Sequence, residues 1–207
     1  MVVIIDYQAG NLTSVVRSFK VLGVEGEVTH DPDAVARAER IVFPGVGAAG
    51  RAMAILKELK LDQALKKAFD KGVPILGICL GAQVILEFSD ENDNTPCLGL
   101  IPGRTRALPR QPGLKIPHMG WNTVSFLRQH PISQGLPESA EYYFVHSYYP
   151  SPAQENMVLW VTEHGITFPS VMGQRNLVAT QFHPEKSGRF GLQLLKNFLA
   201  WDGSYAE

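Results

Sequence analysis

The chain reads VPILGICLGAQVILE from Val73 to Glu87, and this stretch decides the fold. Its first residues, Val73–Ile78, form a short apolar run typical of a buried strand, and residues 80–88 have a helical pattern. Gly77-Ile78-Cys79-Leu80-Gly81 joins the two and has the G-x-C-x-G form of a nucleophile elbow, a sharp strand-to-helix turn. The stretch therefore predicts a strand, a tight turn and a helix, with the Cys79 side chain presented at the turn.

The residues around Cys79 favour a reactive thiol over a core cysteine. Free cysteine is among the most buried residue types, so a lone cysteine is usually part of the core. Here Gly77 and Gly81 have the spacing of a tight elbow, where neighbouring backbone comes so close that Cβ atoms would clash. A helix that starts at Leu80 directs its N-terminal dipole and free amides at the sulfur, which favours the nucleophilic thiolate. Cys97 lacks such a setting, and we expect it to be structural.

Strand and helix patterns alternate through the first ninety residues. Strands are predicted at 2–5, 27–29, 41–43 (ended by Pro44-Gly45) and 73–78, and helices at 12–22 (with Asn11 as N-cap), 53–59, 61–69 and 80–88. Such alternation is typical of parallel strands joined by crossover helices. The sequence therefore predicts an α/β, doubly wound fold with a mostly parallel central sheet and flanking helices.

The second half of the chain has a different character. Pro and Gly recur between residues 89 and 120, which favours short strands and turns. Further strand patterns and a C-terminal helix follow, at 142–145, 157–162, 170–173, 178–182 and 190–201. We expect a small antiparallel sheet beside the central one. No repeat, low-complexity tract or clear linker interrupts the sequence, so we expect a single domain over residues 1–207.

Composition excludes several classes of protein. Of the 207 residues, 45% are hydrophobic and 19% are charged, which suits a folded core and not a disordered chain. The net charge is −1 and no basic run occurs, so nucleic-acid binding is not expected. The longest apolar runs are too short to span a membrane, and the N-terminus lacks the pattern of a signal peptide. With only two cysteines and no metal-binding spacing, we expect a cytoplasmic protein with free thiols.

A second motif, His183-Pro184-Glu185, stands far downstream of the elbow. It closes the apolar run Val178–Phe182, at the carboxyl end of a predicted strand, where α/β sheets bind their ligands. Residues two apart in extended backbone face the same side, so Glu185 can reach an imidazole nitrogen of His183 and hold its tautomer. The two motifs together predict a Cys79–His183–Glu185 catalytic triad.

Acyl transfer at a cysteine also needs donors for the developing oxyanion. The amide of Leu80, directly after the nucleophile, is one expected donor. Pro44-Gly45-Val46-Gly47 follows the third predicted strand at the same sheet edge and could present the amide of Val46 or Gly47. The alternative for this segment is an ordinary turn between a strand and a helix.

With these motifs in place, the chain resembles the class I (triad) glutamine amidotransferases, which carry a G-x-C-x-G-x-Q elbow and a distant H-P-E. The resemblance implies their flavodoxin-like fold. More narrowly, the chain resembles the glutaminase subunits of imidazole glycerol phosphate synthase, and the similarity covers nearly its whole length. The segments that carry the narrower resemblance are Asp6–Leu12, Pro44–Gly47, Pro117–Asn122 and His183–Gly188.

The resemblance implies an activity and a set of site residues. Glutamine is hydrolysed through a cysteine thioester, and ammonia passes to a (β/α)8-barrel cyclase in a heterodimer that forms imidazole glycerol phosphate for histidine biosynthesis. Gln83, Ser147 and Tyr148 are the implied glutamine-binding residues. The docking face for the cyclase is expected to include Asn11, Trp121, Tyr143 and Lys186. No cofactor and no metal ion are implied.

Two other interpretations remain open at this stage. The same glutaminase chemistry could serve another synthase, such as an anthranilate or aminodeoxychorismate partner, although His118-Met119-Gly120-Trp121-Asn122 and the lysine after H-P-E argue against it. The chain could also be a non-enzymatic module whose elbow cysteine senses oxidants or binds a partner. The intact His183 and Glu185 pair argues against that second alternative.

Overall fold

The computed structural model describes residues 1–8 and 12–204, and their largest feature is a nine-stranded sheet. The strand order is β2-β1-β3-β4-β13-β12-β11-β8-β9. The first five strands in this order are parallel: β2 Gly26–Thr29, β1 Val2–Ile5, β3 Arg40–Gly45, β4 Ile75–Cys79 and β13 Leu177–Thr180. The other four pair antiparallel: β12 Thr167–Gln174, β11 Val158–Glu163, β8 His118–Phe126 and β9 Ser139–His146.

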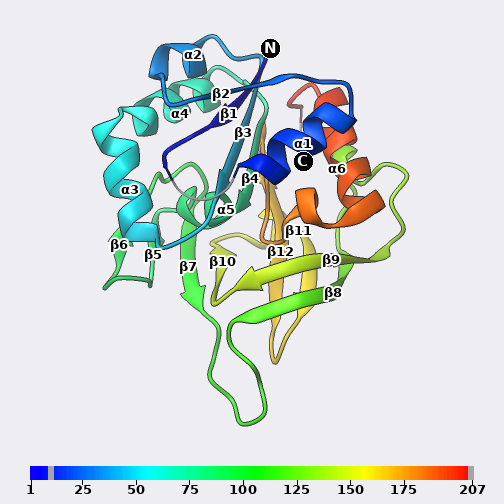
Figure 1. Ribbon diagram of the computed structural model, residues 1–207. Helices are drawn as coiled ribbons and strands as arrows, with labels where there is room; N and C mark the ends of the chain where they lie inside the picture. Colours follow the sequence, from blue (N-terminus) through cyan, green and yellow to red (C-terminus); the bar gives the residue numbers. More distant parts are fainter. Residues whose placement is uncertain (9–11, 205–207) are drawn as a thin grey trace.

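Helices cover both faces of the parallel half (Figure 1). One face carries α2 Pro32–Ala36, α3 Ala49–Glu58 and α4 Leu61–Asp70, and the other carries α1 Thr13–Val21 and α6 Gly188–Ala200. Side chains of a strand alternate between the faces, so Val3 and Ile5 pack with α3 and α4, whereas Val2 and Ile4 pack with α1 and α6. Strands buried on both sides are continuous hydrophobic runs, as β1 is.

A second sheet of four strands lies beside the first. Its order is β10-β7-β5-β6, with β10 Tyr148–Pro152, β7 Gly103–Ala107, β5 Phe88–Ser89 and β6 Thr95–Pro96. The remaining described elements are α5 Leu80–Val84 and three 3₁₀ turns, η1 Pro131–Ser133, η2 Glu155–Met157 and η3 Pro184–Lys186. The small sheet reaches the site because β10 follows directly after β9 along the chain.

The predicted α/β, doubly wound architecture is confirmed, with differences in detail. The central sheet is parallel only on the side of β1 to β4 and β13, because the later strands join through antiparallel neighbours. In the small sheet, β5 and β7 pair parallel, so that sheet is mixed. The predicted end of β3 before Pro44 is wrong: Pro44 and Gly45 continue the strand by pairing with Ile78 and Cys79. Pairing with a neighbouring strand thus outweighs the tendency of Pro-Gly to end one.

The helix predicted over residues 80–88 is also shorter than expected and ends at Val84. The amide of Leu98 donates to the Val84 carbonyl at 2.9 Å, and the amide of Leu100 donates to the Ile85 carbonyl at 2.8 Å. These long-range hydrogen bonds take the carbonyls that a longer helix would use itself. The chain can then turn into β5, which no helical periodicity could have foretold.

We expect Gly81→Ala to lower the free energy of unfolding by about 1–3 kcal/mol, the usual cost of overpacking. A Cβ on Gly81 would fall on the carbonyl oxygen of Phe43 in β3, and backbone cannot move aside as a side chain can. Chemical denaturation measures the change. Gly50→Ala is the matched control, since its Cβ would lie 3.2 Å from the movable Asn92 amide and the helix gains from alanine. Equal stability of both variants would contradict the close approach.

Candidate functional site

The tip of the elbow holds Cys79 in backbone geometry that few residues adopt. Cys79 ends β4 with φ 54° and ψ −107°, and α5 begins at the next residue. A positive φ in a residue other than glycine is strained and is typical of functional positions. Two glycines make room for the turn, because a Cβ on Gly77 would lie 3.1 Å from the Ala179 Cβ and one on Gly81 would meet Phe43. The elbow predicted from the sequence is present, and its side chain is largely buried.

His183 reaches the elbow because β13 lies directly beside β4 in the sheet. The two strands are parallel, so their carboxyl ends meet at one edge. The His183 amide donates to the Tyr143 carbonyl at 2.9 Å, which ties this segment to β9. The sheet order therefore brings His183 and Cys79 together from distant parts of the chain.

Glu185 contacts His183 as expected, although the backbone geometry differs from the expectation. The His183 Nδ1 lies 2.7 Å from the Glu185 Oε1. We expected extended backbone, but Pro184 starts the 3₁₀ turn η3, and the carboxylate reaches back from inside that turn. Both side chains are almost fully buried, so the pair is shielded from solvent.

Charge at His183 is controlled by its two partners. Burial lowers the pKa of His183, but hydrogen bonding to Cys79 and to Glu185 outweighs burial and raises the pKa to about 10. An imidazolium beside sulfur favours the thiolate, which is the nucleophilic form.

A cavity of about 360 Å³ opens beside Cys79. Its lining includes all the residues that we expected to stabilise an oxyanion or to bind glutamine, namely Val46, Gly47, Leu80, Gln83, Ser147 and Tyr148. Gly47 has a φ of +98°, which fits the predicted turn after β3. Glu91, Pro117, Val145 and His146 complete the lining, and sequence reasoning missed them.

The Gln83 amide is engaged within the protein. Its Nε2 donates to the Tyr148 carbonyl at 2.8 Å and to the Gln181 Oε1 at 2.9 Å. The Gln181 Nε2 in turn lies 3.7 Å from the Cys79 sulfur. Sequence reasoning missed Gln181, which the structure shows to be fully buried. The only signal in the sequence was its place as a polar residue at the end of an apolar run, two residues before His183.

Three of the four expected docking residues lie together, and Asn11 lies outside the described residues. Trp121 and Tyr143 are cross-strand neighbours in β8 and β9, with ring centroids 6.2 Å apart. The Lys186 Nζ lies 5.9 Å from the centre of the Tyr143 ring. Trp121 is 55% exposed and Met119, on the same face of β8, is 63% exposed, so neither belongs to the core. We call Trp121, Tyr143 and Lys186 the docking surface, after the role that we expect of them.

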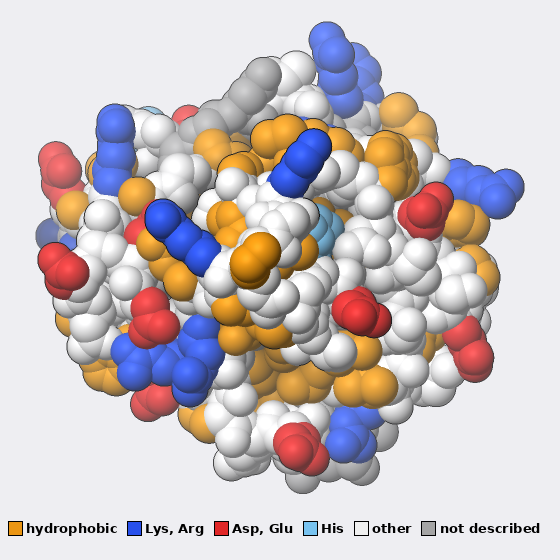
Figure 2. All heavy atoms as spheres, turned by 90° about the horizontal axis from the view of Figure 1, so that it is seen from below, with side chains coloured by type: hydrophobic (Ala, Val, Ile, Leu, Met, Phe, Trp, Pro, Cys, Tyr) orange, Lys and Arg blue, Asp and Glu red, His pale blue; other side chains and the backbone are white. Residues whose placement is uncertain are grey.

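The end of the molecule that carries β8 and β9 exposes hydrophobic side chains near its centre, with most charged side chains toward its rim (Figure 2). Exposed apolar side chains that gather in this way are typical of interaction surfaces.

Cys97 differs from Cys79 in its surroundings. Burial, the main cause, raises the pKa of the Cys97 thiol to about 11, so it stays protonated near neutral pH. Within residues 1–8 and 12–204, no cluster of three or more His, Cys, Asp or Glu side chains could hold a metal ion. None of the helices in that part of the chain is long and apolar enough to cross a membrane.

The fold and this site define a class of protein. Residues 3–201 match the family profile of the class I glutamine amidotransferases, so the chain belongs to that family. Its curated relatives narrow the similarity to "Imidazole glycerol phosphate synthase subunit HisH". The protein of that name from Dehalococcoides mccartyi is 45% identical over 96% of both chains. The one from Nitrosococcus oceani is 45% identical over 98% of both, and the one from Nitratidesulfovibrio vulgaris 46% over 97% of both.

Solved structures support the fold at lower sequence identity. PurLQS from Thermotoga maritima matches with a TM-score of 0.76 and 16% identity, covering 96% of this chain and 97% of that chain. The glutaminase domain of Trypanosoma brucei CTPS matches with a TM-score of 0.67 and 16% identity, covering 99% and 95%. The fold is therefore shared well beyond the relatives named HisH.

We expect His183 to keep its proton as the pH rises past 6.5, the ordinary pKa of histidine, and to lose it near pH 10. The raised pKa means that the protonated form dominates between these two values. Nuclear magnetic resonance of isotope-labelled histidine side chains measures the titration. Glu185→Gln removes one negative partner and is expected to lower the transition. His118 is the internal control, because burial and then His164 lower its pKa to about 4. A His183 that titrates at its ordinary pKa would contradict the charge arrangement.

Proposed function

We propose that this protein hydrolyses glutamine to glutamate and passes the ammonia to a (β/α)8-barrel cyclase, which uses it to form imidazole glycerol phosphate in histidine biosynthesis. One observation carries the proposal: Cys79, His183 and Glu185 interact in series beside a cavity of about 360 Å³. Relatives at about 45% identity over nearly the full length support the choice of synthase.

The proposed reaction uses the triad in turn. The Cys79 thiolate attacks the side-chain amide carbon of glutamine, and the amide of Leu80 with the Val46–Gly47 segment stabilises the oxyanion. The His183 imidazolium gives its proton to the departing nitrogen, and ammonia leaves. Neutral His183 then takes a proton from water, whose oxygen attacks the thioester. The carbon–sulfur bond breaks and glutamate leaves, which restores the Cys79 thiolate and the His183 imidazolium. Glutamine and water thus become glutamate and ammonia.

Glutamine enters as a zwitterion, and the cavity offers one carboxylate for its ammonium group. Among the described residues of the lining, Glu91 is the only acidic one. Its Oε2 accepts from the Ala49 amide at 2.7 Å, which anchors the side chain at the start of α3. Gln83, Ser147 and Tyr148 also line the cavity, and the Gln83 Nε2 donates to the Tyr148 carbonyl. We propose that Glu91 binds the ammonium group and that Gln83, Ser147 and Tyr148 contact the rest of the substrate.

The partner would sit over the docking surface. A second cavity, of about 230 Å³, is lined by Val46, His183 and Lys186 together with apolar residues that include Leu12 and Val15. Because His183 releases ammonia and Lys186 belongs to the docking surface, we propose this cavity as the route by which ammonia leaves. Ammonia that escapes into water becomes ammonium, and ammonium is not a nucleophile. A route closed by the partner would prevent this loss.

The remaining features suit one heterodimeric enzyme in the cytoplasm. We propose that residues 1–207 form a single glutaminase domain, supported by two hydrophobic cores that share the strands of one sheet. Both cysteines are free, as expected in a reducing compartment. Service to an anthranilate-type synthase is the second candidate, but the curated relatives favour the cyclase.

We expect Cys79→Ala to abolish glutamate release from glutamine when the purified cyclase and its nucleotide ligand are present. Without the sulfur no thioester can form, so the loss should exceed about 10³-fold. A coupled glutamate assay measures the rate. Cys97→Ala is the matched control and should keep the wild-type rate, because that thiol lies outside the cavity lining. A fully active Cys79→Ala variant would refute the proposed function.

We expect Glu91→Gln to raise the KM for glutamine more than it lowers kcat. The loss of an ion pair with the substrate weakens binding by about tenfold or more, whereas the reacting atoms are untouched. Steady-state kinetics of the complex separate the two constants. Glu87→Gln, which changes a nearby carboxylate outside the cavity lining, serves as the control. A Glu91→Gln variant with normal KM and reduced kcat would contradict the assignment.

A further inference from the structure

A chain of hydrogen bonds begins at Asn122 in β8, next to the docking surface. The Asn122 Nδ2 donates to the Glu163 carbonyl at 2.9 Å and to the His118 Nε2 at 3.1 Å. The Asn122 Oδ1 accepts from the Thr123 amide at 2.8 Å. These partners fix the orientation of the Asn122 amide, because its nitrogen faces one carbonyl and its oxygen faces one N–H.

The next two members are buried histidines whose protons are fixed by the same reasoning. The His146 Nδ1 lies 2.8 Å from the Tyr148 carbonyl, which can only accept, so His146 carries its proton on Nδ1. Its Nε2 is then an acceptor, and the His118 Nδ1 donates to it at 2.9 Å. This leaves the His118 Nε2 to accept from Asn122. Both rings are neutral and both carry the proton on Nδ1.

Burial keeps these two rings uncharged. It is the main cause that lowers the pKa of His118 to about 4 and that of His146 to about 3, and neighbouring histidines lower both further. His146 lines the cavity, so a neutral ring stands a short way from the charged His183. From Asn122 to the Tyr148 carbonyl, the chain therefore keeps one direction of donation throughout the neutral pH range.

The chain continues from Tyr148 to the nucleophile. The Tyr148 carbonyl also accepts from the Gln83 Nε2 at 2.8 Å, and that same nitrogen donates to the Gln181 Oε1 at 2.9 Å. The Gln181 Nε2 donates to the Cys79 sulfur at 3.7 Å. One continuous series of hydrogen bonds thus joins Asn122 in β8 to the reacting sulfur of Cys79.

We propose that this chain, Asn122–His118–His146–Tyr148–Gln83–Gln181, is a positioning network that sets the wall of the glutamine cavity and aims the Gln181 amide at the sulfur of Cys79. The inference rests on the proposed function. Gln181 touches the reacting atom, and its N–H stabilises negative charge on sulfur. The two histidines act through others and are positioning residues. A network in which every member is satisfied is rigid, and the loss of one member leaves its neighbours buried and unpaired.

The test is a double-mutant cycle on the complex with the purified cyclase. His118→Phe keeps the ring stacked between Phe144 and His164 but removes both nitrogens, and Gln181→Met removes the amide at similar size. Each is expected to lower kcat/KM for glutamine by about tenfold, and the double variant by about tenfold as well, not by the hundredfold product that independent sites give. Three other members of the hydrogen-bond chain separate His118 from Gln181. A non-additive effect of the two substitutions therefore shows that the coupling runs through those members.

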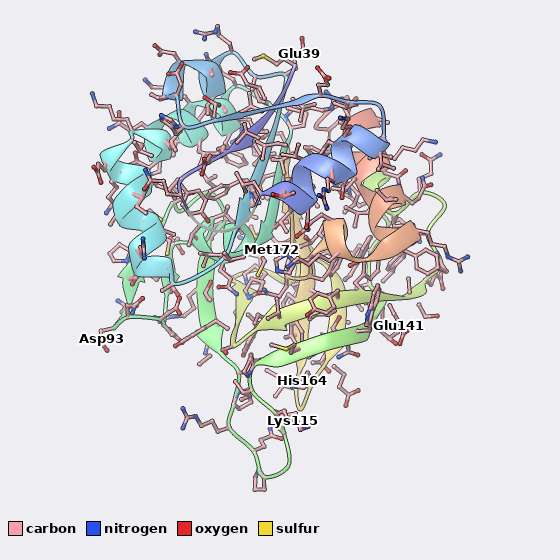
Figure 3. The ribbon with its side chains drawn as sticks, in the orientation of Figure 1. Glu39, Asp93, Lys115, Glu141, His164 and Met172 are labelled. Carbon is pink, nitrogen blue, oxygen red and sulfur yellow. The ribbon has the colours of Figure 1, made fainter. Side chains whose placement is uncertain are left out.

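A control variant at His164 and a rescue variant at His118 test the network further. His164 stacks on His118 with ring centroids 4.0 Å apart, but its Nε2 bonds to the Lys115 carbonyl, outside the chain. His164 and Lys115 lie close together below β8 (Figure 3). His164→Phe should therefore leave kcat/KM unchanged. His118→Asn offers an amide N–H in place of Nδ1 and should recover most of the activity lost in His118→Phe.

A second measurement needs no variant and no activity. Nitrogen-15 spectra of the free protein should show His118 and His146 both neutral with the proton on Nδ1 at neutral pH. A proton on Nε2 of either ring, or multiplicative losses in the double variant, would overturn the network. Wild-type rates in His118→Phe together with loss in Cys79→Ala would overturn it while leaving the proposed function intact. Absence of glutaminase activity in the wild-type complex would refute the function itself.

Discussion

The close approach of Gly81 to the Phe43 carbonyl is the constraint on which the rest of the site depends. It allows β4 to turn into α5 without a gap, and the turn holds Cys79 at a φ of 54°. Strain of this kind persists only where surrounding structure over-determines it, and here the neighbouring strands β3 and β13 do so on both sides. The cavity lies where it does because the elbow lifts the sulfur to the carboxyl edge of the parallel strands.

Opposite electrostatic outcomes at neighbouring histidines show how local partners decide chemistry. Burial disfavours the charged form of a histidine. Burial dominates at His118, and it also dominates at His146 although the hydrogen bond to the Tyr148 carbonyl acts against it, so their pKa values fall to about 4 and about 3. His183 is buried as well, yet the sulfur of Cys79 and the carboxylate of Glu185 raise its pKa to about 10. A charged proton donor, His183, therefore stands near a neutral ring in the cavity lining, His146, and each supports a different part of the proposed reaction.

The parallel and antiparallel halves of the central sheet supply different parts of the site. The parallel half supplies the elbow and His183, because parallel strands bring their carboxyl ends to one edge. The antiparallel half supplies β8 and β9, which carry the exposed Trp121 and the half-buried Tyr143 of the proposed docking surface. The same strands carry His146, which lines the cavity, and the buried His118 that bonds to it. A partner seated on β8 would thus contact the same strand from which the positioning network starts.

The sequence by itself determined the elements whose signals are local. The apolar run before Cys79, the glycines beside it and the H-P-E motif were enough to predict an α/β fold and to single out Cys79, His183 and Glu185. Tertiary structure decided the ends of the strands and helices and the membership of the site, because these depend on which distant segments meet. Pairing with β4 carried β3 through Pro44-Gly45, and hydrogen bonds from Leu98 and Leu100 ended α5 early. Glu91, His146 and Gln181 are single polar residues with no motif, and only the folded chain shows that they converge on one cavity and one sulfur. Short-range patterns report backbone preference and burial, whereas a cavity wall is assembled from residues whose proximity no spacing records.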